Sequence, residues 1–250
     1  MRKALSLIIP VIVIIPVFLA SVLYGLVPAF ILQILGARKA AETWRRLCIL
    51  GIARWALFGL NVRVNTTGRE NMPPAGTPLC IIVNHQSLLD VVAVVGYSGT
   101  IPGFIAKKEL SFIPIIASYM KGLHCVMLDR KSPKSSIASI SEGVKNITRG
   151  IPMVVFPEGT RSKDGKLGEF KAGSLKLATR SKATIVPIAI SGGRKAFEER
   201  RGIRRTVMTM HICPPVPTHD FSREAEKEFT AQVYGELAEG YRHLLSRHEA

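Results

Sequence analysis

The feature that most limits how this chain can fold is an N-terminal run without a charged residue, which extends from Ala4 to Ala37. At about 1.5 Å per residue, one continuous helix over this run would be roughly 50 Å long. The hydrocarbon core of a bilayer is only about 30 Å thick. The run also contains Pro10, Pro16 and Pro28, and a proline inside a helix kinks or ends it. We therefore expect a helical segment that is embedded in a membrane and is kinked or folded back.

Two arrangements of this membrane anchor, which we assign to residues 1–36, agree with the sequence. One is a single tilted span with an interfacial extension, and the other is a re-entrant pair of shorter helices that enters one leaflet. A cleaved signal peptide is a poorer explanation, because the apolar run is far longer than the roughly 7–15 residues of a signal sequence.

Basic residues follow the apolar run at Arg38, Lys39, Arg45, Arg46 and Arg54. They predict an interfacial basic helix over residues 37–60, whose cations rest on anionic headgroups. By the positive-inside tendency they also place the rest of the chain on the cytoplasmic face of the inner membrane. The whole chain has a formal charge of +16, which suits nucleic acid, an anionic membrane surface or a phosphorylated substrate.

Residues 61–250 contain short apolar runs that alternate with longer amphipathic stretches. The runs predict strands at Leu79–Val83, Phe104–Ala106, Cys125–Leu128, Met153–Phe156, Thr184–Ile190 and Thr206–Ile212. The stretches predict helices at Ser87–Val95, Pro114–Met120, Ser135–Ile147 and Gly173–Ala178. This alternation predicts one domain of the α/β class, with a largely parallel sheet flanked by helices.

A last helix is expected from about Ser222 to Arg247. Apolar residues recur there at every fourth position, at Phe221, Ala225, Phe229, Val233, Leu237 and Tyr241. This stripe predicts that the helix docks along the domain.

The first candidate site is the segment NHQSLLD at residues 84–90, which follows one predicted strand and opens a helix. A carboxylate bonded to one ring nitrogen of a histidine fixes the tautomer and leaves the other nitrogen as a base. Residues five apart do not share a face of a helix, so His85 must precede the helix that contains Asp90. His124 and Asp129 have the same spacing. His124 opens the predicted strand Cys125–Leu128, however, so alternation sends the two side chains to opposite faces of the sheet.

The second candidate site is the segment FPEGTRS at residues 156–162, at the end of another predicted strand. Gly159 permits a tight turn that exposes backbone N–H groups, Thr160 adds a hydroxyl, and Arg161 can bind a phosphate with two parallel hydrogen bonds. These residue types in this order predict a site for an anion.

Two further strands are followed by basic residues, at Lys107-Lys108 and at Asp129-Arg130. Segments that follow the carboxyl ends of parallel strands meet at one edge of the sheet. We therefore expect His85, Lys107, Arg130 and Arg161 to converge on one cleft. Lys108 is more simply explained as a solvated surface lysine, and for Arg130 a solvated surface position is an equal alternative.

Cysteine usage points away from metal and thiol chemistry. The four cysteines lie in apolar stretches without a CxxC pair, which predicts small buried side chains in a reducing compartment. No Cys/His cluster has the spacing of metal ligands, so no metal site is expected. No GxSxG elbow or Cys-His arrangement offers a covalent nucleophile.

Together, these sequence motifs resemble those of the glycerolipid acyltransferase family over roughly residues 85–192. The resemblance is specifically to the bacterial-type 1-acyl-glycerol-3-phosphate acyltransferases. The similarity includes FKAGS at residues 170–174 and Val-Pro-Ile at residues 186–188. The resemblance implies that His85 is the general base, oriented by Asp90.

It further implies that Lys107 and Arg161 hold the phosphate of the acceptor, at a site that Glu158 and Gly159 shape. Thr160 and Arg130 complete the expected phosphate-binding set.

The expected reaction is acyl transfer from an acyl thioester to the free hydroxyl of 1-acyl-glycerol-3-phosphate, a membrane lipid, which yields phosphatidic acid. The donor is acyl-CoA or acyl carrier protein, and no cofactor is implied. Another lysophospholipid or a lyso-aminolipid is the alternative acceptor. Nucleic acid is not expected as a partner, because no aromatic-interleaved basic stretch occurs.

Overall fold

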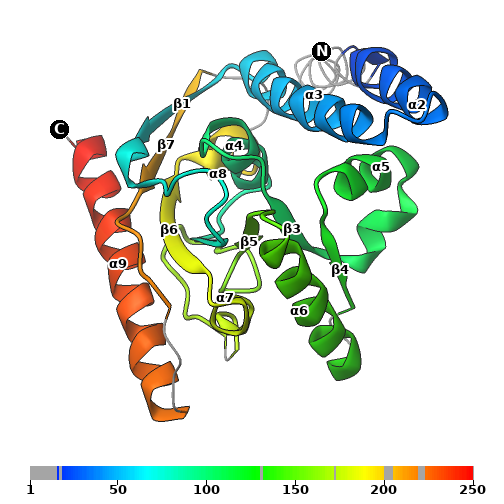
Figure 1. The fold of residues 1–250 in the computed structure, drawn as a ribbon. Coiled ribbons are helices and arrows are strands. Elements are labelled where there is room, and N and C mark those ends of the chain that lie inside the picture. The colour runs from blue at the N-terminus through cyan, green and yellow to red at the C-terminus, as the bar shows by residue number, and fades with distance from the viewer. Residues whose placement is uncertain are drawn as a thin grey trace. The chain divides into compact units, whose positions relative to one another are not determined.

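The computed structural model describes residues 16, 19–129, 132–171, 173–199, 205–218 and 223–249. The chain divides into two compact units, each discontinuous in sequence. Unit 1 comprises residues 1–65, 87–101 and 192–208, and unit 2 comprises residues 66–86, 102–191 and 209–250. Figure 1 shows the order of the helices and strands along the chain.

Seven strands form one sheet in the order β1-β7-β6-β2-β5-β3-β4. Their bounds are Val62–Thr67 (β1), Leu79–Val83 (β2), Gly103–Lys107 (β3), Val126–Leu128 (β4), Met153–Val155 (β5), Thr184–Ser191 (β6) and Thr206–Ile212 (β7). The five strands from β6 to β4 are parallel, and β7 pairs antiparallel with β6. The largely parallel sheet of the predicted α/β class is therefore confirmed.

Each of the six predicted strands is present, with bounds that shift by at most one residue at either end. The prediction missed β1, because Val62 is the only fully buried residue in it and the other positions are largely polar. The central strand β2, by contrast, is buried along its whole length, as expected for a parallel strand.

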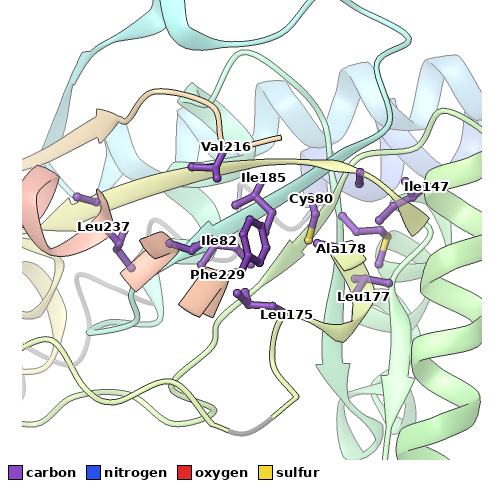
Figure 2. Packing of buried hydrophobic residues seen from close by; sticks show 14 of the residues in the cluster. Cys80, Ile82, Ile147, Leu175, Leu177, Ala178, Ile185, Val216, Phe229 and Leu237 are labelled. Carbon is purple, nitrogen blue, oxygen red and sulfur yellow. The ribbon is translucent and has the colours of Figure 1, made fainter. Parts of the chain in front are cut away.

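Helices α6 (Pro133–Thr148), α7 (Lys176–Ser181) and α9 (Arg223–Glu249) of unit 2 cover one face of its strands. Helix α5 (Pro114–Gly122) packs against the 3₁₀ turn η3 (Lys108–Phe112), and another short 3₁₀ turn, η2 (Arg69–Asn71), follows β1. Cys80 and Ile82 of β2 share a hydrophobic cluster with Leu177 of α7 and Phe229 of α9. Figure 2 shows these side chains converging between the sheet and the helices. Because Cys80 and Ile82 are two residues apart, they point to the same face of the sheet.

Helix α9 carries the predicted apolar stripe. Phe229, Val233, Leu237 and Tyr241 are all buried in the cluster, and α9 packs along β6 (Figure 1). The predicted docking of this helix is confirmed for these positions, whereas Phe221 lies outside the described residues.

Unit 1 is built on helices. The π-helix η1 (Ser21–Leu26) and helix α2 (Val27–Ile34) pack against α3 (Arg38–Gly59), and α3 packs against α4 (Leu89–Tyr97). The range predicted to be a basic helix is helical, since α3 spans most of it. Arg54 on α3 donates a hydrogen bond to the carbonyl of Gly96 on α4 (2.9 Å). The short helix α8 (Gly193–Phe197) was not predicted, because its five residues are too few for a periodic pattern.

Large apolar side chains remain exposed along η1, α2 and α3. Phe30 and Ile34 are 64% and 69% exposed on α2, and Trp55 and Phe58 are 66% and 74% exposed on α3. Within the described part of the chain, no helix is both long enough and apolar enough to cross a membrane. Most of the predicted anchor before Leu19 lies outside the described residues.

Candidate functional site

Three neighbouring strands of unit 2 carry predicted polar residues at their carboxyl ends. His85 follows β2, the segment Glu158 to Arg161 follows β5, and Lys107 ends β3. Because β2, β5 and β3 are adjacent and parallel, these positions lie at the same edge of the sheet. His85, Lys107 and Arg161 therefore share one edge of the sheet, as expected from parallel strands.

The imidazole of His85 rests on an aromatic platform. Its ring stacks on Phe156, with centroids 4.1 Å apart and planes inclined by 25°. Phe156 in turn lies against Phe104 of β3, at 6.3 Å between ring centroids. These rings restrict where the half-buried imidazole can lie.

The main chain of His85 is held by a buried carboxylate. Glu158 is only 6% exposed. Its Oε1 accepts a hydrogen bond from the amide of His85 (3.0 Å), and its Oε2 accepts one from the amide of Gly168 (3.2 Å). The amide of Ser162 donates to the carbonyl of His85 (2.8 Å). A buried carboxyl group is stable only with such partners. Glu158 therefore fixes the loop that carries His85 against the loop after β5.

Both neighbours of His85 in the sequence are also anchored. The side chain of Asn84 bonds to both backbone groups of Ile190 on β6, donating to its carbonyl (2.9 Å) and accepting from its amide (2.7 Å). The buried amide of Gln86 donates to the carbonyl of Gly165 and to the hydroxyl of Tyr241 on α9. The hydroxyl of Tyr241 donates in turn to Gly165. The turn at His85 is thus held from β6 and from α9.

The turn after β5 depends on a glycine. Gly159 has a φ of +68°, and a Cβ at this position would come within 3.0 Å of the Lys171 side chain. A side chain here would be strained as well as crowded. Thr160 and Arg161, which follow, are exposed at the edge of the sheet, so their hydroxyl and guanidinium groups are accessible to a ligand.

The loop beyond Arg161 is ordered by its own side chains. Asp164 accepts hydrogen bonds from the amide of Lys166 (3.1 Å) and from the hydroxyl of Ser162 (2.9 Å). These bonds, that of Lys166 first, lower the pKa of Asp164 below its usual value. The carboxylate is therefore charged and bonded at neutral pH.

Lys107 forms an exposed ion pair with Glu109 at 3.1 Å. The pKa of Glu109 is lowered, mainly by a backbone hydrogen bond and then by the hydrogen bond from Lys107. Exposed ion pairs contribute only about 0–1 kcal/mol, so the ammonium group can exchange this partner for a phosphate. Lys108 forms a longer ion pair with Asp129, at 3.8 Å. Arg130, which was predicted to join the site, lies outside the described residues.

Asp90 belongs to unit 1, because the boundary between the units falls between Gln86 and Ser87. The carboxylate is fully buried, and its Oδ2 accepts a hydrogen bond from the amide of Ser87 (2.7 Å). Glu198, just after α8, accepts bonds from the hydroxyl of Ser87 (2.7 Å) and the amide of Leu88 (2.9 Å). A Cβ on Gly193 would come within 2.9 Å of Asp90. Hydrogen bonds to Asp90 and Glu198 therefore hold the residues just before α4 in place.

The prediction that His124 opens a strand is wrong. His124 has a φ of +56° and lies in a left-handed turn before β4, not at the start of the strand. The alternation of side chains along a strand therefore does not apply to it. Instead, His124 precedes β4 and Asp129 follows it, so the two residues lie at opposite ends of the strand. Since β4 is parallel to β3, β5 and β2, His124 is at the sheet edge opposite His85.

The thiols are kept protonated by burial. All four cysteines are free, and burial raises the pKa of Cys80 and Cys213 to about 12 and that of Cys125 to about 11. Since the thiolate is the nucleophile, Cys125 is a poor nucleophile at neutral pH. Among the described residues, no group of three His, Cys, Asp or Glu side chains could hold a metal ion.

Several residues that hold the site were not predicted. Gln86, Tyr241, Gly193 and Glu198 act through contacts between segments far apart in sequence, such as the 155 positions that separate Gln86 from Tyr241. No local periodicity marks such pairs. The one available signal was the position of Tyr241 on the apolar stripe, since a buried tyrosine hydroxyl needs a hydrogen-bond partner.

Comparison with known proteins agrees with this arrangement. The family model described as Acyltransferase matches residues 63–191, about half of the chain. A solved structure, the 1-acyl-sn-glycerophosphate (LPA) acyltransferase PlsC from Thermotoga maritima, is similar with a TM-score of 0.78 and 29% sequence identity. The match covers 98% of both chains.

Curated relatives show the same similarity. The 1-acyl-sn-glycerol-3-phosphate acyltransferase of Saccharomyces cerevisiae is 29% identical over 86% of this chain and 71% of the relative. The chloroplastic 1-acyl-sn-glycerol-3-phosphate acyltransferase LPAT1 of Arabidopsis thaliana is 36% identical over 53% of this chain, and the match spans only 37% of that protein. The family model covers all the candidate site residues, from His85 to Arg161, and on this basis the chain belongs to the Acyltransferase family.

Proposed function

We propose that the chain transfers an acyl group from an acyl thioester to the free hydroxyl of 1-acyl-glycerol-3-phosphate, and so makes phosphatidic acid in phospholipid biosynthesis. The observation that carries this proposal is the common position of His85, Lys107 and Arg161 at the carboxyl edge of β2, β3 and β5. One base and two cations at a single edge suit a substrate with a hydroxyl to deprotonate and a phosphate nearby.

In the proposed reaction, the imidazole of His85 removes the proton of the acceptor hydroxyl as the oxygen attacks the thioester carbonyl. The tetrahedral intermediate collapses, the carbon–sulfur bond breaks, and the imidazolium returns the proton to the leaving thiolate. We propose direct attack, because the sequence contains no GxSxG elbow and no Cys-His arrangement that would supply a covalent nucleophile. Asp90, five positions after His85, is the carboxylate we assign to orienting the imidazole, on the basis of the sequence spacing.

The acceptor phosphate is assigned to Arg161, Lys107, Thr160 and Arg130. Arg161 supplies a fork of N–H donors that matches phosphate oxygens, whereas the ammonium group of Lys107 acts as a point charge. The positive φ of Gly159 turns the backbone into the loop that carries Thr160 and Arg161. The roles proposed for Glu158 and Gly159 are to shape this loop.

Residues 1–36 are proposed to anchor the chain in the inner membrane, with residues 37–60 at the interface and the catalytic domain facing the cytoplasm. The support is the uncharged run up to Ala37, the exposed Phe30 and Phe58, and the cations at the start of α3. Either acyl-CoA or acyl carrier protein serves as donor, since both present the same thioester. Another lysophospholipid or a lyso-aminolipid is the second candidate acceptor.

The direct test is to incubate the purified protein with a panel of lysolipids and both thioester donors and to identify products by mass spectrometry. We expect phosphatidic acid from 1-acyl-glycerol-3-phosphate. His85→Ala should lower kcat by roughly 10²–10⁴, the usual contribution of a positioned general base.

His124→Ala is the matched control. It should keep most activity, because His124 lies at the opposite edge of the sheet. The proposal fails if His85→Ala, folded as judged by circular dichroism, stays active while His124→Ala is dead. A faster reaction with another lysophospholipid or with a lyso-aminolipid would move the proposal to that acceptor.

A second prediction concerns the phosphate. Arg161→Ala should raise KM for the acceptor about ten-fold or more, because charged hydrogen bonds contribute about 1.5–3 kcal/mol each. Lys107→Ala should act in the same direction, more mildly. Lys163→Ala removes an exposed cation two positions after Arg161 and controls for net charge. If KM for the acceptor were the same in Arg161→Ala, Lys107→Ala and the control, the phosphate assignment would be wrong.

A third prediction concerns the anchor. Deletion of residues 1–36 should release much of the protein from vesicles, and it should lower activity on lipid in vesicles more than on dispersed acceptor. Sedimentation with vesicles at high salt measures the first effect. Full sedimentation of the truncated protein under these conditions would place the anchor elsewhere.

A further inference from the structure

Exposed apolar side chains of unit 2 are concentrated in one short stretch. Six large hydrophobic residues are exposed in the described part of this unit, and four of them lie between positions 110 and 116. These four are Leu110, Phe112, Ile113 and Ile116, and we refer to them as the η3–α5 patch. Phe112 is 75% exposed, which is unusual for a phenylalanine in a folded domain.

Packing within unit 2 leaves this patch uncovered. Helix α5 already buries Met120, and Leu123 is buried just beyond its end. The patch lies on η3 and the first turn of α5, before those buried positions. A cluster of exposed apolar side chains of this kind marks an interaction surface.

Charge favours an anionic partner for the patch. Between positions 107 and 122 there are three cations, Lys107, Lys108 and Lys121, and one anion, Glu109. Lys107 and Lys108 form exposed ion pairs with Glu109 and Asp129, which contribute little and can be exchanged for lipid phosphates. All three lysines are exposed. Apolar side chains that are flanked by lysines fit the boundary between acyl chains and anionic headgroups.

We propose that the η3–α5 patch is a lipid-contacting surface, which inserts into the membrane that supplies the acceptor. The inference rests on the proposed function, because the patch begins three residues after Lys107, which is assigned to the phosphate of the acceptor. A lipid whose phosphate reaches Lys107 still has its acyl chain in the bilayer. The bilayer surface then lies close to Phe112 and Ile113, which would insert into it. The patch belongs to unit 2 and is distinct from the apolar residues of α2 and α3.

The test places an environment-sensitive label on the patch. Phe112→Cys, in a Cys48→Ser background, is labelled with an NBD fluorophore and mixed with vesicles of phosphatidylcholine and phosphatidylglycerol. Cys80, Cys125 and Cys213 react slowly, because burial raises their pKa to about 12, 11 and 12. We expect a blue shift of emission and loss of quenching by aqueous iodide.

Ile137→Cys is the matched control, because Ile137 is 62% exposed on α6, also in unit 2. Its label should keep its emission and its quenching. Equal behaviour of the two labels, or a shift at position 112 with acyl carrier protein but not with vesicles, would overturn the proposal. The same labels in a His85→Ala chain report insertion without turnover, so failure of the proposed reaction is recognised separately.

A second measurement uses substitution. Phe112→Ser with Ile113→Ser should lower activity on acceptor in vesicles by about ten-fold or more, because the double substitution removes two apolar side chains that insert into the membrane. Activity on a dispersed short-chain acceptor should stay near that of the unmodified protein. Equal losses on both forms of acceptor would contradict insertion.

Discussion

The rest of the site depends on the hydrogen bonds that the buried carboxyl group of Glu158 accepts. This group joins the loops after two adjacent strands, through hydrogen bonds to the amides of His85 and Gly168. The reciprocal bond from Ser162 to the carbonyl of His85 closes this connection. The position of the imidazole is therefore set by the backbone that carries it and by the ring of Phe156 beneath it. A loop fixed in this way loses little conformational entropy when a substrate binds.

The parallel sheet explains why a few functional side chains are enough to build the proposed site. Parallel strands bring the ends of β2, β5 and β3 to one edge, where the rings of His85, Phe156 and Phe104 stack in a row. Each loop then needs only one functional group, such as the imidazole of His85 or the guanidinium of Arg161. The supporting contacts come from behind the edge, where Asn84 binds β6 and Gln86 binds α9.

Sequence patterns predicted the parts of this fold that depend on local periodicity. The apolar run of β2 and the four-residue spacing on α9 identified both elements, because burial on a regular element leaves a regular pattern. β1 was missed because only Val62 of that strand is fully buried. The position of His124 was also missed, since a left-handed backbone at a non-glycine residue has no strong sequence signal. Likewise, Glu198 could not be linked to Ser87, 111 positions away, without the fold.

The central claim is that Glu158 holds His85 in place for catalysis. Measurement of kcat for Glu158→Gln tests it most directly, because the amide keeps the shape of the side chain but loses one accepting oxygen. Misplacement of the imidazole by about 1 Å predicts a fall in kcat of up to about 100-fold in a folded protein. Glu169→Gln, at an exposed position in the same segment, should leave kcat unchanged. A folded Glu158→Gln variant with the kcat of the unmodified protein would contradict the account.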